Sequence, residues 1–318
     1  MLRSRLRCSQ WKQVWEEIKI PVPWGHIAGK WWGPQDKRPI LVLHGWQDNC
    51  GSFDRLIPLL KPNPGYLAID FPGHGLSSNL PLGVSYYWSD YIVFIRRIVQ
   101  YFNWPKVSFL AHSISGSAAY NYATLYPDTV DFLIAIEGLK PLTNDLKITE
   151  LGDNIDRLIK YDHLLSLGQE GPSYTYEELE KRLHSDSEKS ISPDMCKYIL
   201  ERSISKSSTN PNKFYFTRDL RLKLLPFLEY KNEDVMKMVD KFTCPALLCL
   251  GTVETNKFKV LTQTPEFYEI LKKINLKFEI HTVEGTHHVH LNNPERLGEL
   301  INSFIEKYDL GDRSIENV

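Results

Sequence analysis

The sequence lacks the features that mark disulfide-rich, membrane-spanning or nucleic-acid-binding proteins. Its five cysteines are scattered, odd in number and without a C-x-x-C pair, which favours a reducing compartment over a disulfide scaffold. No apolar run is long enough to cross a bilayer, and no secretory h-region is present. The 38 basic residues are balanced by 39 acidic ones, so there is no excess charge to neutralise phosphates. We therefore expect no transmembrane segment and no nucleic-acid partner.

Glycine motifs for nucleotide cofactors are also missing. No G-x-G-x-x-G follows the early strand-like segments, and the GHG within FPGHGLSS (71–78) is a turn that does not lead straight into a helix N-terminus. We therefore expect no cofactor. The chain has no internal repeat and no low-complexity tract, and 318 residues suffice for one large domain with an insertion or for two ordinary domains.

Strand-like and helix-like segments alternate along most of the chain, a pattern typical of a mostly parallel sheet with helices on both faces. Two opening segments, 16–22 and 26–33, read as an antiparallel pair. The further expected strands are 38–45, 65–70, 106–113, 130–138, 244–251 and 276–285. Helices are expected over 85–102, 265–274 and 293–308. In the first of these, six residues recur at helical spacing and are expected to pack on the sheet: Tyr87, Tyr91, Phe94, Ile95, Ile98 and Tyr101.

A charged, helical block interrupts this alternation. Helices separated by Ser, Pro and Gly breaks are expected over 151–167, 174–185, 192–204 and 232–242. Because the α/β pattern resumes afterwards, the block reads as an inserted cap. The predicted organisation is an α/β core formed by 16–141 and 241–310, a helical cap over 142–240, and a short tail over 311–318.

The first 15 residues form a basic leader, with three arginines and no acid before Glu16. Such a leader resembles a weak mitochondrial transit peptide, although a frayed terminus is the simpler interpretation. The last five residues, SIENV, match neither the ER-retention nor the peroxisomal signal. We expect a cytoplasmic protein, with a mitochondrial or peroxisomal location as the alternatives.

Ser113 lies at a corner between an apolar strand and a run of small residues, in the stretch VSFLAHSISGSAAY (107–120). A nucleophile elbow, the tight strand-to-helix turn that presents a catalytic serine, needs small residues two before and two after that serine. Ala111 and Ser115 meet this steric requirement, although neither is the usual glycine. Ser113 is therefore the candidate nucleophile, and an ordinary helix cap is the alternative.

An anion site is expected at the end of the strand 38–45, where His44 and Gly45 precede Trp46. In elbow enzymes, the N–H of the residue after the nucleophile and an N–H from this strand end together form the oxyanion hole. The expected donors are therefore the backbone N–H groups of Ile114 and Trp46. His44 itself is expected to brace the loop through a hydrogen bond.

A general base must come from late in the chain, because elbow enzymes carry their residues in the order nucleophile, acid, histidine. The segment VEGTHHVHLNNPERL (283–297) contains His287, His288 and His290. His287, two residues after Gly285 at a strand end, is the preferred base. Adjacent histidines on an extended loop point in different directions, so we expect no metal site here.

Two glutamates are candidates for the acid that orients this histidine. Glu254 lies three residues after Gly251 at the end of the strand 244–251, the usual position for this residue order. Glu137 lies at the end of the earlier strand 130–138, from which a carboxylate could reach the same histidine. The residues alone leave this choice open.

These motifs together resemble the α/β-hydrolase superfamily over nearly the whole chain. A closer resemblance, to the serine hydrolase-like (kraken-type) proteins of animals, is carried by VPWGHIAGKWWG, LHGWQDNCGSFDRLIPLL, AIDFPGHGLSS, AHSISG and GTHHVHLNNP. It implies the α/β-hydrolase fold with a helical cap, and a serine hydrolase whose natural substrate is undefined. It also favours Glu137 over Glu254 as the acid.

Two functions from different classes follow. The first is a serine hydrolase that cleaves a small acyl substrate, such as a carboxylic ester, through Ser113, His287 and an acid. A serine at the nucleophile position disfavours dehalogenation and epoxide hydrolysis, which proceed through an alkyl-enzyme ester. The second is a ligand-binding protein that has kept the fold with weak or no turnover. Substrate identity depends on the cap, whose packing a linear sequence does not give.

Overall fold

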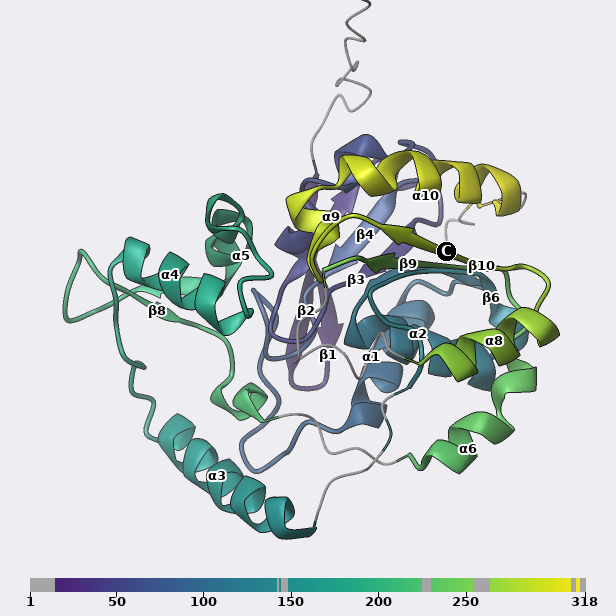
Figure 1. Cartoon of the computed structure of the whole chain (residues 1–318). Helices are drawn as coiled ribbons and strands as arrows, with labels where there is room; N and C mark the ends of the chain where they lie inside the picture. The colour runs from purple at the N-terminus through teal and green to yellow at the C-terminus, as the bar shows by residue number, and fades with distance from the viewer. Residues whose placement is uncertain are drawn as a thin grey trace, which may run out of the picture.

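An eight-stranded sheet forms the centre of the molecule (Figure 1). The computed structural model describes residues 15–141, 143, 148–224, 230–253, 264–309 and 313–314. The strands of this sheet are β1 (Glu16–Val22), β2 (Gly25–Trp32), β3 (Ile40–Leu43), β4 (Tyr66–Ile69), β5 (Val107–His112), β6 (Val130–Ile136), β9 (Ala246–Gly251) and β10 (Phe278–Val283). All eight expected strands are present.

The strands lie in the order β1-β2-β4-β3-β5-β6-β9-β10. β1 and β2 form the expected antiparallel hairpin, β2 pairs antiparallel with β4, and every later neighbour pairs in parallel. Parallel strands direct their carboxyl ends to one edge of the sheet, which is where open α/β folds place their sites. The ends of β3, β5, β6, β9 and β10 therefore lie along a single edge.

Both faces of the sheet are buried, which explains why its strands are continuously apolar. In β3, Leu41 and Leu43 contribute to one hydrophobic cluster, while Ile40 and Val42 contribute to a second cluster on the opposite face. This alternation follows from the two-residue side-chain period of a strand.

Helices cover the two faces of the sheet, as predicted. α1 (Trp88–Tyr101), α2 (Ile114–Leu125) and α8 (Pro265–Ile274) lie on one face, and α10 (Glu295–Tyr308) lies on the other beside the short α9 (Val289–Asn292) (Figure 1). No helix within the described residues is long and apolar enough to cross a bilayer.

The apolar stripe of α1 packs on the sheet as predicted, except at its ends. Tyr91, Phe94, Ile95 and Ile98 are buried within the larger of the two core clusters. The two outermost residues of the predicted stripe are exposed instead of buried. Tyr87 precedes the first helical turn in an extended conformation, and Tyr101 is the last residue of the helix. The predicted stripe was therefore one residue too long at each end.

The inserted block contains α3 (Ile148–Ser166), α4 (Tyr176–Asp186) and α5 (Cys196–Ser203), which lie to one side of the sheet (Figure 1). It also contains a small antiparallel pair that the helical prediction missed, β7 (Ile204–Lys206) and β8 (Phe214–Phe216). Each strand is only three residues long, too short for a recognisable alternation, although the aromatic run 214–216 has strand propensity.

The later part of the predicted cap range packs on the α/β body. α6 (Asn232–Lys237) falls within that range, yet Val235 and the nearby Val239 belong to the main core cluster. The cap has a small cluster of its own, which includes Leu291 of α9 and so joins the cap to the sheet edge. The basic leader up to residue 14 and most of the predicted tail lie outside the described residues.

Candidate active site

Ser113 forms the corner between β5 and α2 in a backbone conformation that is unfavourable for a residue with a side chain. Its φ is 57° and its ψ is −126°. Such strained non-glycine positions are concentrated at functional sites, where the surrounding structure must hold them in place. Here the Ser113 N–H donates to the Ile136 carbonyl on the neighbouring strand β6, at 2.7 Å. The predicted corner is thus a strained turn fixed by the sheet.

The sequence permits this turn because α2 begins with small residues. A Cβ atom on Gly116 would lie only 1.9 Å from the Gly138 carbonyl oxygen, so the helix can approach β6 only without a side chain there. Ser115, two residues after the serine, donates its hydroxyl to the His44 carbonyl. The departure from glycine at this position therefore adds a hydrogen bond that ties α2 to the end of β3.

His287 connects Ser113 to Glu137 through two hydrogen bonds. The Ser113 hydroxyl donates to His287 Nε2 at 2.8 Å, and His287 Nδ1–H donates to Glu137 Oε2 at 3.0 Å. All three side chains are buried. The structure thus brings together three of the predicted site residues, which are separated by as many as 174 positions in the chain.

Glu137 is positioned by the ends of two strands. It follows β6 with a φ of 63°, and its N–H donates to the Cys249 carbonyl of β9 at 2.9 Å. Its Oε1 accepts a hydrogen bond from the Gly251 N–H, which leaves Oε2 to face His287. Glu254, the other candidate acid, lies outside the described residues.

Burial favours the neutral form of His287. Burial first, and then the neighbouring His112 and His288, hold the pKa of His287 well below its usual range. An unprotonated Nε2 facing a serine hydroxyl can accept its proton, and a carboxylate on Nδ1 fixes the tautomer and stabilises the imidazolium that would result. The arrangement has the geometry required for general-base activation of Ser113.

Comparison with known proteins defines the family. A model of the alpha/beta hydrolase family matches residues 40–300. The chain belongs to this family. A protein of Drosophila melanogaster described as "Probable serine hydrolase" is 36% identical over 301 residues, covering 92% of this chain and 88% of the relative. A "Serine hydrolase-like protein" of Danio rerio is 34% identical over 294 residues, covering 91% and 88%.

A solved structure supports the same assignment. A hypothetical protein from Pseudomonas aeruginosa PAO1 superposes with a TM-score of 0.74 at 27% identity, covering 92% of this chain and 98% of that one. The predicted fold class and the resemblance to serine hydrolase-like proteins are therefore confirmed.

Trp46, in the loop after β3, and Ile114, the first residue of α2, carry the two backbone N–H groups expected as donors. Neither Trp46 N–H nor Ile114 N–H has an acceptor among the described residues, so both are available to a bound group. The loop is held at this point by two hydrogen bonds: His44 Nδ1–H donates to the Gly45 carbonyl at 2.7 Å, and its Nε2 accepts from Phe71 N–H at 2.9 Å. His44 thus has the bracing role predicted for it.

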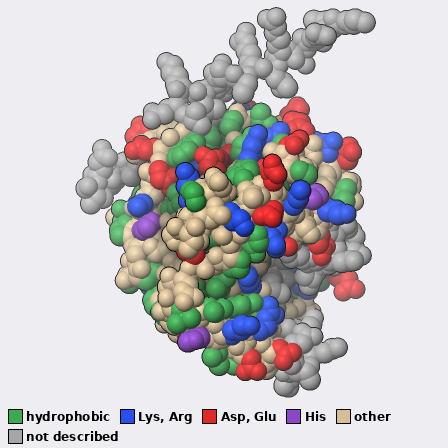
Figure 2. Space-filling view, turned by 90° about the vertical axis from the view of Figure 1, so that its left-hand side faces the viewer, with side chains coloured by type: hydrophobic (Ala, Val, Ile, Leu, Met, Phe, Trp, Pro, Cys, Tyr) green, Lys and Arg blue, Asp and Glu red, His purple; other side chains and the backbone are tan. Residues whose placement is uncertain are grey.

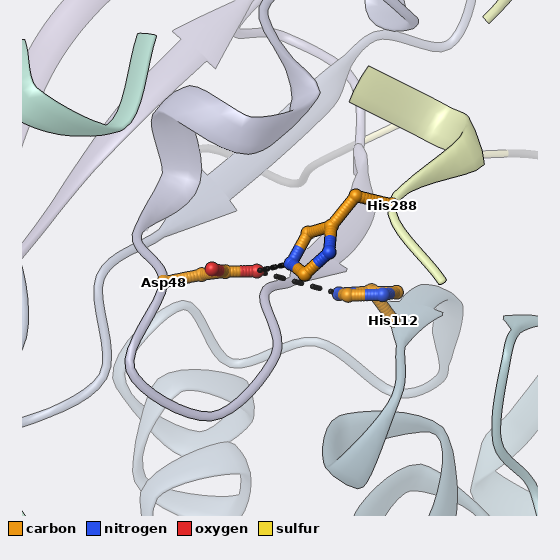
Figure 3. A group of neighbouring side chains, drawn as sticks. All are labelled: Asp48, His112 and His288. Carbon is orange, nitrogen blue, oxygen red and sulfur yellow. Dashed lines mark hydrogen bonds and ion pairs between the residues drawn. The ribbon is translucent and has the colours of Figure 1, made fainter. Parts of the chain in front are cut away.

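A second carboxylate–imidazole group lines the same pocket as Ser113 and consists of Asp48, His112 and His288. Figure 3 shows these three side chains. Asp48 Oδ2 lies 3.2 Å from His288 Nε2 and 3.5 Å from His112 Nδ1. Burial opposes ionisation, but His288 and His112 outweigh it and hold the pKa of Asp48 well below its usual range. His112 Nε2–H also donates to the His287 carbonyl at 2.9 Å, so the group supports the backbone of the candidate base.

This group also has the composition of a transition-metal site. The ligand atoms of Asp48, His112 and His288 lie within 4.8 Å of one another, and all three residues are buried. One carboxylate and two imidazoles are ligands that suit Zn²⁺. Part of the group is also hydrogen-bonded without a metal, because His288 Nε2 pairs with Asp48 Oδ2 at 3.2 Å and His288 Nδ1 with the Ser190 hydroxyl at 2.7 Å.

Sequence reasoning missed this group for a clear reason. His112 and His288 each adjoin a predicted site residue, and the expectation of no metal site rested on the histidine run alone, without Asp48 or His112. Asp48 lies four residues after His44, in a loop where roles were predicted only for His44 and for the Trp46 N–H. The sequence did contain a signal for this group, because Asp48, His112 and His288 each lie within two residues of a predicted site residue.

The pocket of this hydrolase opens between the sheet edge and the cap and has a volume of about 180 Å³. Ser113, His287 and Trp46 line its floor together with the Asp48 group. The cap supplies the remaining wall, which includes Tyr174, Arg182, Leu183, Asp186, Ile191, Phe216, Arg218 and Lys223. Residues of the cap and Ser113 therefore line the same pocket.

Proposed function

We propose that this alpha/beta hydrolase is a serine hydrolase that cleaves small carboxylic esters. The observation that carries the proposal is the continuous hydrogen-bonded series from the Ser113 hydroxyl through His287 to Glu137. A serine that only capped a helix would need neither a buried imidazole on its hydroxyl nor a carboxylate behind that imidazole. Ser113 also makes no side-chain cap hydrogen bond to its helix.

The reaction follows from these positions. Ser113 Oγ attacks the ester carbonyl carbon while His287 Nε2 takes the hydroxyl proton, which gives a tetrahedral intermediate. Collapse of this intermediate expels the alcohol, which receives the proton from His287 and leaves an acyl group on Ser113. A water molecule then attacks the acyl carbonyl, with His287 again as the base, to release the acid and restore the serine.

The backbone N–H groups of Trp46 and Ile114 are the proposed oxyanion hole. Each would donate to the carbonyl oxygen as negative charge develops on it. Loss of one such donor in a comparable enzyme raises the barrier by about 3–4 kcal/mol. Because both N–H groups belong to backbone held by His44 and Ser115, they require little reorganisation during the reaction.

The proposal is tested by labelling the purified protein with a fluorophosphonate probe and locating the adduct by peptide mass spectrometry. We expect an adduct on Ser113 that is absent from Ser113→Ala, and hydrolysis of short aryl esters that falls at least about 10³-fold in this variant. Ser117→Ala is the matched control, because the Ser117 hydroxyl donates to the Lys140 carbonyl and faces no base. It should keep both labelling and turnover.

An unlabelled Ser113 in a protein that is folded by circular dichroism, together with no ester turnover, would contradict the proposal. That result would favour the second function considered above, a ligand-binding protein with the hydrolase fold. Screening for bound small molecules by thermal shift would then be the next measurement.

A further inference from the structure

The cap wall of the pocket carries cations that no ion pair balances. Three basic side chains line the pocket: Arg182, Arg218 and Lys223. None of them has a carboxylate within ion-pair distance among the residues that the structure describes. Figure 2 looks onto this side of the molecule, where lysine and arginine side chains border a hollow in the surface.

Two of these cations are ordinary surface groups. Arg182 and Lys223 are exposed, and they lie over the rings of Tyr174 and Tyr161, at 4.0 and 5.8 Å from the ring centroids. Water screens charges in such positions, so they require no partner. Arg218 differs because it is only partly accessible to water.

The acids near Arg218 are engaged elsewhere or distant from it. Its neighbour Asp219 forms a two-pronged ion pair with Arg221, at 2.7 and 3.0 Å, and also accepts from Tyr86. Asp48 faces the two histidines described above. Asp186 is exposed and acts on Arg218 only at longer range.

Arg218 is therefore a poorly hydrated cation, most of whose N–H groups have no acceptor within the described part of the chain. Of its five N–H groups, one donates to the Gln47 carbonyl at 3.3 Å, a long hydrogen bond. Burial lowers the pKa of Arg218 to about 10, which indicates how unfavourable the uncompensated charge is. Binding of a carboxylate at such a site is favourable, because the guanidinium offers a planar pair of donors that matches the two carboxylate oxygens.

Arg218 lies close to the loop that carries Trp46, whose N–H is a proposed oxyanion donor. Gln47 directly follows Trp46 and is itself held by the Leu222 carbonyl and by His74. An anion on Arg218 would thus lie in the same pocket as Ser113 and close to the oxyanion loop. A short carbon chain would bridge the two points, in keeping with a pocket of about 180 Å³.

We propose that Arg218 binds a carboxylate on the substrate, so that the preferred substrates are short esters that carry an anionic group a few carbons from the scissile carbonyl. This inference rests on the proposed function. It assigns to Arg218 the selection of one chemical class among esters.

The test compares two esters with four-carbon acyl groups, 4-methylumbelliferyl butyrate and 4-methylumbelliferyl hemisuccinate, in the second of which the terminal methyl is replaced by a carboxylate. We expect the wild type to hydrolyse the hemisuccinate with the higher kcat/KM. Arg218→Gln should lower kcat/KM for the hemisuccinate about 10–100-fold, the usual effect of losing a charge-assisted hydrogen bond, and at least 10-fold more than for the butyrate. Arg218→Lys, which keeps the charge, should restore part of the difference.

Lys223→Gln is the matched control, because it removes a positive charge from the exposed rim of the same pocket. Its effect should be small and should disappear in 0.5 M NaCl, whereas the Arg218→Gln effect should persist. A second pair, phenyl butyrate and 4-butyryloxybenzoate, places the carboxylate on the leaving group. A preference for either charged ester that depends on Arg218 supports the proposal and identifies the side of the ester that bears the anion.

Equal loss on charged and neutral esters in Arg218→Gln, or no preference of the wild type for either charged ester, would overturn the inference. Thermal unfolding of Arg218→Gln distinguishes a true loss of activity from misfolding. Removal of an uncompensated charge should leave Tm unchanged or raise it, so a lower Tm would indicate misfolding. Fluorophosphonate labelling of Ser113 in the wild type shows which proposal has failed. A labelled serine without charge preference refutes only the substrate class, and an unlabelled serine refutes the hydrolase.

Discussion

Glu137 illustrates how much depends on a single side chain at this site. It occupies a left-handed backbone conformation, accepts from Gly251 N–H with one oxygen and faces His287 with the other. In Glu137→Gln the amide oxygen can still accept from Gly251, but the side chain can no longer stabilise a charged imidazole. We expect kcat for aryl esters to fall about 10³–10⁴-fold with little change in Tm, measured by steady-state kinetics and thermal unfolding.

Glu254→Gln is the control for this experiment, because Glu254 occupies the usual position of the acid in the sequence. We expect its kcat to stay within about twofold of the wild type. A larger loss in Glu254→Gln than in Glu137→Gln would show that the acid had been assigned to the wrong strand.

At the scale of elements, one arginine holds the cap helix α5 against the sheet. Arg202 donates to Asp70, which follows β4, at 2.7 and 3.1 Å, and to both oxygens of Glu17 in β1 at 2.8 Å. Burial opposes ionisation of Asp70, but Arg202 outweighs it and lowers the pKa of that carboxyl. The ion pair therefore links three segments that are remote in sequence.

Removing the arginine would leave Asp70 buried without a cation. We expect Arg202→Met to lower the free energy of unfolding by about 3–5 kcal/mol, measured by urea denaturation. Lys237→Met, which breaks the exposed pair with Asp234, should shift the midpoint little. Similar midpoints for the two variants would mean that Arg202 contributes no more than a surface charge.

For the whole molecule, buried histidines set the response to acid. Burial is the first cause that lowers the pKa of His44, His74, His112, His287 and His290. Below about pH 6.5 the unfolded chain therefore binds more protons than the folded protein, and stability is lost as the pH falls. Asp54 acts in the opposite direction, because burial raises its pKa to about 6 and the folded state takes up a proton there.

Five histidines outweigh one aspartate, so we expect the free energy of unfolding to decrease steadily from pH 7 to pH 5. Urea midpoints measured at half-unit intervals would check this. Asp48 and Asp70, whose pKa values are lowered, should add their own loss of stability only below about pH 4. A midpoint that is constant or rises between pH 7 and pH 5 would contradict the assignment of these histidines as neutral and buried.

Several parts of the fold and site were predictable because their causes are local in the chain. Continuous apolar runs such as Ile40–Leu43 require burial on both faces, and the small residues after Ser113 permit a tight turn. The cap hairpin escaped prediction because strands as short as Phe214–Phe216 are stabilised by pairing with a distant partner and have no period of their own.

The sequence by itself determined the mostly parallel sheet, the corner that presents Ser113 and the choice of a histidine after the last strand. Only the tertiary structure decided that Glu137 faces His287, that Asp48 joins two histidines and that Arg218 forms no ion pair with any residue the structure describes. The physical reason is range. Hydrophobic period and turn sterics act between neighbours in the chain, whereas the partner of a charge depends on distances of a few ångströms and on burial, which strand order and cap packing set.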